Sequence, residues 1–462
     1  MAESSPMTNR SRRTRTRGLG VLIAALVVAS CGSSAPTTPP ATDAPSPTAT
    51  LPGASPTLAP SPSSTAAAIT CDESTGADPS PAADDSDPNA ALYGEIEAQV
   101  SALRGITATT PVARGVFDVP GLCAYLRKSL REDNPAELIA ATDTLYHELQ
   151  LLPAGTTLEK VYLDLLTSQV AGLYDDDTKH MYVVTKSGAI GPLEEITYAH
   201  EYTHALQDQA FGLRKLIGED KDQGDRALAR SALIEGDATL LMSLWAQQQL
   251  TAAELAELAS TSDPAGTAAL EAAPTILRDS LLFPYTSGLT VALGGFQSGG
   301  GFGGVDALFA TPPDSTEQVL HPEKFAAREA PVKVTIPEDL AASLGAGWTV
   351  PLQDTLGELQ LEILLREGGA SGTRTAAEGW GGDRVALVEG PGGAVAVVID
   401  SVWDTDADAA EFAAALVPLV ETLKAAGRSA AVLLPEAGRV VLISGSSADV
   451  LGRVANILGL AQ

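Results

Sequence analysis

The segment His200-Glu201-Tyr202-Thr203-His204 has residue types and a spacing that suit chemistry on a metal ion. The chain has only five histidines in 462 residues, and two of them stand four positions apart here. On a helix, side chains at positions i and i+4 share one face, so both imidazoles can reach the same metal ion. Glu201 follows the first histidine and would lie beside that ion, where its carboxylate can take a proton from a water molecule.

The residues around this segment predict the helix that it needs. Gly191-Pro192 lies just upstream, and proline is favoured at the first position of a helix. Neither proline nor glycine interrupts residues 194–208. A stripe of uncharged residues runs beside the two histidines: Ile196, Ala199, Thr203 and Leu206. The alternative is a chance match on a surface helix, but a solvated face would more often carry lysine and glutamate at these positions.

A third metal ligand is expected from a second helix about thirty residues downstream. Glu235 is the candidate, because it lies in an apolar run with Leu233, Ile234, Leu240 and Leu241 as neighbours. A buried carboxylate is costly unless it is paired or bound to a metal. Asp237 is less suited to the same role, since two residues further on it points about 200° round the helix.

These segments resemble those of zinc metallopeptidases of the gluzincin type, whose HExxH helix is followed by a second helix with a glutamate ligand. More closely, they resemble an HExxH family of bacterial secreted and lipid-anchored proteins. The resemblance rests on residues 200–209, 233–239 and 315–323, and it extends over about residues 91–330. It implies a Zn²⁺ peptidase in which His200, His204 and Glu235 bind the metal and Glu201 is the general base.

The chain departs from this pattern at two points. The metzincin extension is absent, because Gln207 and Ala210 stand where that group has glycine and histidine. Thermolysin-like enzymes have an acidic residue four positions after the glutamate ligand, where this chain has Thr239. Asp237 and Asp208 are therefore the candidates to orient the histidines, since metal-binding imidazoles usually donate their second N–H to a carboxylate or carbonyl.

Two further residues are candidates to donate a hydrogen bond to the oxyanion that forms during peptide hydrolysis. His321 lies in the family-like segment 315–323, and Tyr285 lies in Phe-Pro-Tyr-Thr-Ser-Gly at residues 283–288. The alternative for each is structural: a core tyrosine, and a capping histidine before Pro322.

The N-terminus has the features of a bacterial lipoprotein signal peptide over residues 1–30. Five arginines between residues 10 and 17 precede an apolar stretch, residues 19–28, that is short for a membrane span. Val28-Ala29-Ser30-Cys31 resembles a lipobox, which implies lipidation of Cys31 and an anchor on the extracytoplasmic face of the cell membrane. The alternative is an ordinary secretory peptide with an incidental cysteine.

Residues 31–90 are dense in Pro, Ser, Thr and Ala, and we predict a disordered tether there. Once Cys31 is assigned to the lipid, Cys71 and Cys123 remain as an even pair. In an oxidising compartment they are expected to form a disulfide.

The charge narrows the range of partners. With 29 Lys and Arg against 58 Asp and Glu, the formal net charge is −29, which argues against nucleic-acid binding and against attraction to anionic lipids. The expected partners are a peptide or protein substrate, and the membrane through the anchor at Cys31. The sequence does not indicate an oligomeric state.

The predicted fold class is α+β. Residues 91–330 are expected to form a mainly helical, zincin-like metallopeptidase domain with a small β-sheet. A hairpin is predicted over residues 172–184, and the resemblance implies that residues 181–185 form the sheet edge to which an extended peptide adds.

Residues 331–462 are expected to form a smaller α+β domain. Short β-branched runs at 384–389, 394–400, 430–434 and 440–444 predict strands, and residues 406–425 and 448–460 predict helices. This part has no histidine, so we expect a packing or substrate-presenting role.

The sequence thus predicts a membrane-anchored zinc metallopeptidase. The alternative from another class is a non-catalytic envelope lipoprotein, with a binding or structural role and a vestigial or structural zinc site. Glu201 argues against that alternative, because a purely structural site has no use for a general base.

Overall fold

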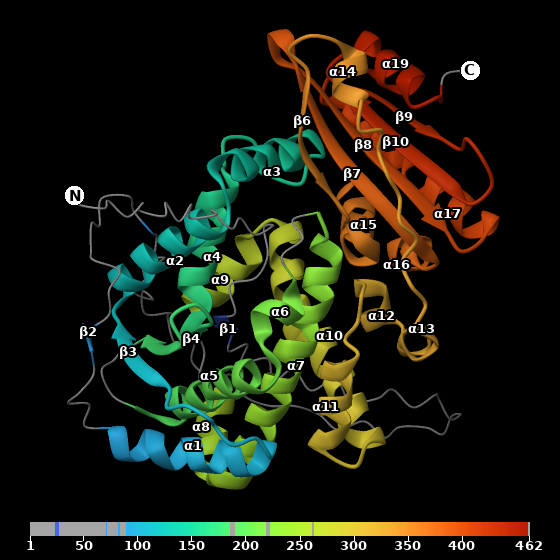
Figure 1. Ribbon diagram of the computed structural model, residues 1–462. Coiled ribbons are helices and arrows are strands. Elements are labelled where there is room, and N and C mark those ends of the chain that lie inside the picture. The colour runs from blue at the N-terminus through green and yellow to red at the C-terminus, as the bar shows by residue number, and fades with distance from the viewer. Residues whose placement is uncertain are drawn as a thin grey trace, which may run out of the picture.

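The computed structural model describes residues 24–26, 71, 82–83, 89–184, 190–218, 222–260 and 263–460. Within these ranges the chain forms a mainly helical part with one small sheet, followed by a smaller part built on a second sheet (Figure 1). The predicted α+β class is confirmed. The predicted lipidation site Cys31 and most of the predicted signal peptide and tether lie outside the described residues. In the described ranges, no helix combines the length and the apolar character that a membrane span requires.

The first sheet has the order β1-β4-β5-β3-β2. Its strands are β1 (Ala24–Leu26), β2 (Ala82–Ala83), β3 (Ala113–Phe117), β4 (Val170–Asp175) and β5 (His180–Val184). β4 and β5 form the predicted hairpin, whose turn is held by Asp175 Oδ1 as it accepts the N–H groups of Asp177 and Thr178. The prediction that β5 is an edge strand is wrong, because β3 pairs in parallel with its other side.

Helices of the first part pack against this sheet. Before the His-Glu-Tyr-Thr-His segment the helices of this part are α1 (Ala90–Arg104), α2 (Val119–Asp133), α3 (Ala136–Glu148) and α4 (Leu158–Gln169). From this segment onward they are α5 (Pro192–Phe211), α6 (Leu213–Ile217), α7 (Gly224–Gln249), α8 (Ala252–Ser260), α9 (Pro264–Ala272), α10 (Thr275–Ser298), α11 (Phe302–Ala310), α12 (Thr316–Leu320) and α13 (Pro322–Ala327). Among them, α2, α4 and α5 contact the strands of the sheet.

α5 carries the His-Glu-Tyr-Thr-His segment and lies in the middle of this part. It begins at Pro192 as predicted, and the Glu194 carboxylate accepts the N–H of Gly191 at 2.9 Å. Every residue from 196 to 208 is buried, because α5 packs against β4, α1 and α7. A helix that is covered on all sides holds its side chains in fixed rotamers, which is what a metal site requires.

α7 crosses α10 at a point where both helices have glycine. A Cβ atom on Gly236 would lie 2.1 Å from the carbonyl oxygen of Gly288, and one on Gly288 would lie 2.0 Å from the carbonyl oxygen of Ala232. Only glycine permits this backbone contact. The crossing brings Glu235 of α7 and Tyr285 of α10 towards the same region.

The second part contains a sheet of order β6-β7-β8-β10-β9 in which every pairing is antiparallel. Its elements are α14 (Leu340–Leu344), β6 (Thr349–Asp354), α15 (Gly357–Glu367), α16 (Thr373–Ala377), β7 (Trp380–Gly390), the short 3-10 turn Pro391–Gly393, β8 (Ala394–Trp403), α17 (Asp406–Ala415), α18 (Val417–Ala425), β9 (Ser429–Leu433), β10 (Arg439–Gly445) and α19 (Ala448–Ile457). The predicted helix over 406–425 is two helices that meet at Leu416. Pro418 lacks the N–H that one continuous helix would need.

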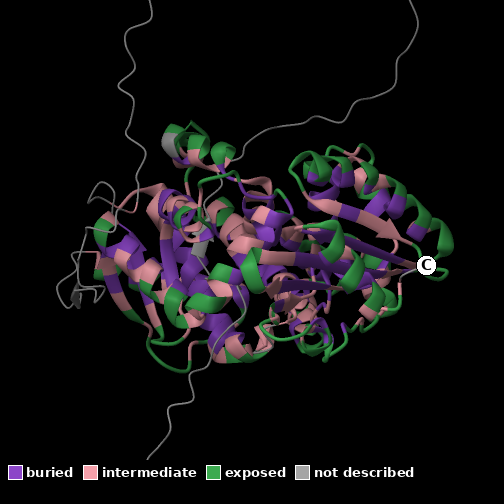
Figure 2. Ribbon diagram, turned by 90° about the horizontal axis from the view of Figure 1, so that it is seen from above, coloured by how far each residue is buried: buried purple, intermediate pink, exposed green. Residues whose placement is uncertain are grey.

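The two parts share a hydrophobic core. One buried cluster joins Leu145 of α3 and Leu277 of α10 to Leu352 of β6 and Val385 of β7. Figure 2 shows buried segments in both parts where they meet. The predicted boundary at residues 330–331 therefore separates two sheets, but it does not separate two independent cores.

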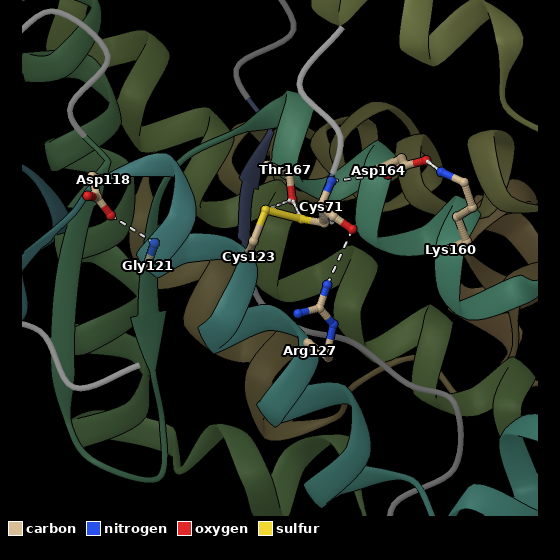
Figure 3. The surroundings of a disulfide bond; sticks show 8 residues. All are labelled: Cys71, Asp118, Gly121, Cys123, Arg127, Lys160, Asp164 and Thr167. Carbon is tan, nitrogen blue, oxygen red and sulfur yellow. Dashed lines mark hydrogen bonds and ion pairs between the residues drawn. A yellow bond between two sulfur atoms is a disulfide. The ribbon is translucent and has the colours of Figure 1, made fainter. Parts of the chain in front are cut away.

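The predicted disulfide between Cys71 and Cys123 is present, with Cα atoms 5.5 Å apart (Figure 3). It attaches the chain at residue 71 to α2. Two hydrogen bonds support the attachment: Arg127 Nη2 donates to the Cys71 carbonyl at 3.3 Å, and the Cys71 N–H donates to Asp164 Oδ1 at 3.4 Å.

Candidate metal centre

Three of the predicted metal ligands converge between α5 and α7. His200 Nε2 lies 3.0 Å from His204 Nε2 and 3.1 Å from Glu235 Oε2, and the last two atoms are 3.3 Å apart. All three residues are at most 2% exposed. The i, i+4 spacing places the two imidazoles on one face of α5. The glycine crossing of α7 and α10 fixes the position of Glu235 on α7.

These distances fit a bound metal ion. Ligand atoms placed about 2.0–2.1 Å from a tetrahedral Zn²⁺ are separated by roughly 3.3–3.4 Å. The three atoms of the triad are separated by 3.0–3.3 Å, so they already lie close to the corners of such a tetrahedron. Two imidazole nitrogens and a carboxylate, facing one another away from water, can hold a metal ion in this space.

The charges of the triad also favour a bound cation. Burial lowers the pKa of His200, so its imidazole is neutral and can serve as a ligand. Burial opposes protonation of His204 as well, but the Glu235 carboxylate outweighs that effect and raises the His204 pKa to about 9. Burial alone would raise the pKa of Glu235, whereas the two imidazoles bring it down to about 2. The pocket therefore stabilises one positive charge beside Glu235.

Gln207 fixes the tautomer of His204. The Gln207 amide Nε2 donates to the Ile234 carbonyl at 3.0 Å and to Asp237 Oδ2 at 2.8 Å. Its Oε1 must therefore accept the hydrogen bond from His204 Nδ1, at 2.8 Å. In the neutral imidazole this leaves the lone pair on Nε2, which faces the other two ligands.

Contrary to the prediction, Asp237 does not contact a histidine directly but contacts Gln207, which in turn contacts His204. It accepts a hydrogen bond from Gln207 and forms a buried ion pair with Arg104, whose Nε lies 3.0 Å from Asp237 Oδ1. Arg104 Nη2 also lies 2.7 Å from Asp306. A chain of contacts thus runs from His204 through Gln207 and Asp237 to Arg104.

The prediction that Asp208 orients a histidine is wrong. Asp208 accepts hydrogen bonds from the Tyr174 hydroxyl at 2.9 Å and from the Leu213 N–H at 3.2 Å, and it pairs with Lys179. It therefore ties the end of α5 to the β4–β5 hairpin. His204 Nδ1 instead donates to Gln207, three residues further along the same helix.

Glu201 is buried beside β4. A Cβ atom on Gly172 of β4 would lie 3.1 Å from Glu201 Cγ and 3.1 Å from Thr197 Cγ2. The strand that contacts the predicted general base is therefore β4, and glycine allows its backbone to pass close to Glu201. The far side of β4 pairs with β1, with Ala24 opposite Leu173 and Leu26 opposite Val170.

The two candidate oxyanion donors have different surroundings. The ring of Tyr285 lies near that of His200, with centroids 6.1 Å apart, and Tyr285 lines a cavity together with Glu235. His321 instead lies between α12 and α13, where its Nε2 is 2.9 Å from Glu358 Oε1. The hydrogen bond to Glu358 raises its pKa. His321 thus joins the two parts of the molecule through Glu358. Its role as an oxyanion donor stays a prediction.

Two other acidic clusters lie in the described ranges, and a basic side chain forms ion pairs with each of them. Arg214 reaches the cluster at residues 175–177, with its Nη2 3.3 Å from Asp176 Oδ1. Lys324 Nζ lies 2.5 Å from Glu317, 3.3 Å from Glu329 and 2.6 Å from Asp404. The centre formed by His200, His204 and Glu235 is therefore the stronger candidate for a metal ion.

Comparison with known proteins adds information about the second part of the chain. Residues 347–454 match a family described as a domain of unknown function, DUF8575. No curated protein and no solved structure matches the chain. The matched residues begin just before β6 and end within α19, so they cover the second sheet and its helices.

Proposed function

We propose that the protein is a zinc metallopeptidase that hydrolyses peptide bonds. The observation that carries this proposal is the convergence of His200 and His204 of α5 with Glu235 of α7, with ligand atoms 3.0–3.3 Å apart. Glu201 lies on α5 next to His200. A bound Zn²⁺ would supply a Lewis acid for the scissile carbonyl and lower the pKa of water. Neutral imidazoles and one carboxylate are ligands that Zn²⁺ prefers.

The side chains of the centre have separate roles in this proposal. Glu201 takes a proton from the attacking water and delivers it to the leaving amine. Tyr285, near the His200 ring, donates a hydrogen bond to the developing oxyanion. Gln207 keeps the Nε2 lone pair of His204 directed at the centre.

An extended substrate would bind by adding to the outer side of β4. This edge passes close to Glu201, and it already pairs with a three-residue antiparallel segment, β1. β1 lies within the predicted signal peptide, so cleavage before Cys31 would free the backbone groups of β4 for a peptide. Main-chain hydrogen bonds of this kind bind many sequences and leave the choice of sequence to side-chain pockets.

The proposed location is the extracytoplasmic face of the cell membrane, with a lipid anchor at Cys31. The test is metabolic labelling with a lipid probe in the wild-type protein and in Cys31→Ser. We expect the label only in the wild type. An unlabelled wild-type protein found in the medium would remove the anchor from the proposal and leave the metal chemistry untouched.

The zinc site is tested by metal analysis of the purified protein. We expect one Zn²⁺ per chain, lost in His204→Ala and retained in His180→Ala, which changes a histidine outside the centre. A peptide library then tests hydrolysis, which should disappear with a zinc chelator and return with added Zn²⁺. Full zinc in His204→Ala would exclude the site. A zinc-loaded wild-type protein that cleaves no peptide would favour the non-catalytic lipoprotein.

A further inference from the structure

A cavity of about 160 Å³ lies beside the metal centre, where the two parts of the molecule meet. Glu235 and Tyr285 line it on the side of the metal centre. The rest of its wall comes from α3, α4, α7 and α10 of the first part, and from β6, β7 and α15 of the second. Neither part encloses this space without the other.

The wall of the cavity is mainly apolar. Aliphatic residues from both parts contribute to it, among them Leu138, Leu145, Ile276, Leu277, Leu352 and Val385. Asp354 also lines it, but its Oδ1 already accepts the N–H groups of Gly224 at 2.7 Å and Thr355 at 2.8 Å. Because Asp354 is engaged by the backbone, the cavity suits an uncharged group better than a basic one.

The size of the cavity decides between two kinds of apolar occupant. A dry cavity of about 150 Å³ lined by aliphatic and aromatic side chains takes up one benzene molecule. A space of 160 Å³ therefore fits one large apolar side chain. It is too small for a long acyl chain, which has more than twice as many carbon atoms as that ring.

We propose that this cavity is the specificity subsite for one large apolar side chain of the substrate, such as Leu, Met or Phe. We also propose that the second part, which matches the family of unknown function over residues 347–454, supplies its outer wall. This inference rests on the proposed peptidase function. Glu235 and Tyr285 belong to both the centre and the cavity wall, so a side chain in the cavity places its own peptide group beside the triad.

Two substitutions would fill the cavity from opposite sides. Ala227→Phe adds a ring from α7, and Gln360→Phe adds one from α15 in the second part; both residues are half-buried and line the cavity. Ala246→Phe is the matched control, because Ala246 is half-buried on α7 and the cavity wall does not include it.

Binding is measured first, since it does not depend on hydrolysis. The probes are N-acetyl-phenylalanine amide and N-acetyl-glycine amide, titrated into the zinc-loaded full chain and followed by NMR. We expect the phenylalanine probe to bind the wild type and Ala246→Phe, and to bind Ala227→Phe and Gln360→Phe roughly tenfold or more weakly. Equal binding of the glycine probe, or unchanged binding in Ala227→Phe, would overturn the subsite. If Gln360→Phe binds the phenylalanine probe as tightly as the wild type, the proposal that the second part supplies the outer wall is overturned.

Cleavage of a peptide library separates this inference from the proposed function. The wild type should cut next to Leu, Met or Phe, and the two cavity variants should shift towards Gly and Ala. Cleavage without a side-chain preference, or with a preference for Lys or Arg, would refute the subsite and leave the peptidase in place. Specific binding of the phenylalanine probe without any cleavage would refute the peptidase and leave the cavity as an apolar binding site.

Discussion

The metal centre and the second sheet bury opposite kinds of side chain. Between α5 and α7 the buried residues include His200, His204, Glu235 and Asp237, and hydrogen bonds or ion pairs connect them. Strands β7, β8 and β10 instead bury mainly Val, Leu, Ile and Ala. Buried polar groups are expensive unless they are paired, and a paired network holds its side chains rigidly, as the proposed metal site requires. In the proposed function, the second sheet contributes through its part of the cavity wall.

The largest expected effect belongs to the metal centre. Glu201→Gln should lower kcat by about 10²–10⁴-fold, because an amide cannot accept the proton of the attacking water. Zinc content should stay at the wild-type value. The matched control is Glu195→Gln, which changes a carboxylate on the same helix outside the triad and should leave kcat unchanged. Equal rates in Glu201→Gln and wild type would show that the buried network serves structure alone.

The glycine crossing of α7 and α10 tests how tightly the centre depends on its scaffold. Gly236→Ala should lower the free energy of unfolding by about 3 kcal/mol or more, because the added Cβ would lie 2.1 Å from the Gly288 carbonyl oxygen. Gly294→Ala, on α10 away from the crossing, is the control, because no atom lies within 4 Å of its Cβ position. That variant should gain about 0.5–1 kcal/mol from higher helix propensity. Urea denaturation measures the stability of both variants. Equal midpoints would contradict the close backbone contact at the crossing.

Arg104 tests whether the remote end of the polar network matters. Arg104→Met should cost about 3–5 kcal/mol, because it leaves the buried Asp237 without its ion-pair partner. Zinc affinity should fall too, since Asp237 positions Gln207 and Gln207 positions His204. The control is Arg131→Met at an ion pair whose arginine side chain is 54% exposed. Such pairs contribute about 1 kcal/mol or less, so similar losses in both variants would contradict the network.

The smallest effect is expected at Asp354, where the two parts meet. Burial raises the pKa of Asp354 to about 7, so between its ordinary pKa of 3.8 and about pH 7 the folded state keeps a proton that the unfolded state releases. Stability therefore falls as the pH rises through this window. Asp354→Asn retains an oxygen acceptor and removes this titration, so the variant should lose less stability than the wild type between pH 5 and pH 8. Urea midpoints at both pH values check this, and equal losses would contradict it.

The sequence predicts the parts of the centre that depend on local spacing. His200 and His204 are four residues apart on one helix, and Glu235 is marked by its apolar neighbours, so both assignments need only helical geometry. The same holds for β7, β8 and β10, whose β-branched runs identify them as strands. A local signal also exists for Gln207, which lies three residues after His204 on the same helix face.

Long-range contacts account for what the sequence alone does not predict. β3 lies more than sixty residues before β5 and pairs with it in parallel, so nothing near β5 shows that the strand is interior. The Glu358 partner of His321 comes from the second part of the chain, 37 residues later. Arg104 and Asp237 are 133 residues apart and meet only in the folded core. One sequence carries no mark of such partners before the fold brings them together.

Because of the disulfide between Cys71 and Cys123, the stability of this protein depends on the redox state of the compartment that contains it. It closes a loop with a sequence separation of 52. By the chain-entropy relation, such a bond contributes about 4 kcal/mol. The disulfide does not persist in the reducing cytoplasm, so this stabilisation is absent there. It is present in an oxidising compartment, where the disulfide forms. If the protein is exported as proposed, full stability arrives only after translocation. The proposed peptidase would then reach its stable fold only outside the cytoplasm, where it cannot cleave cytoplasmic proteins. Oxidation of the two thiols would set the moment at which this happens.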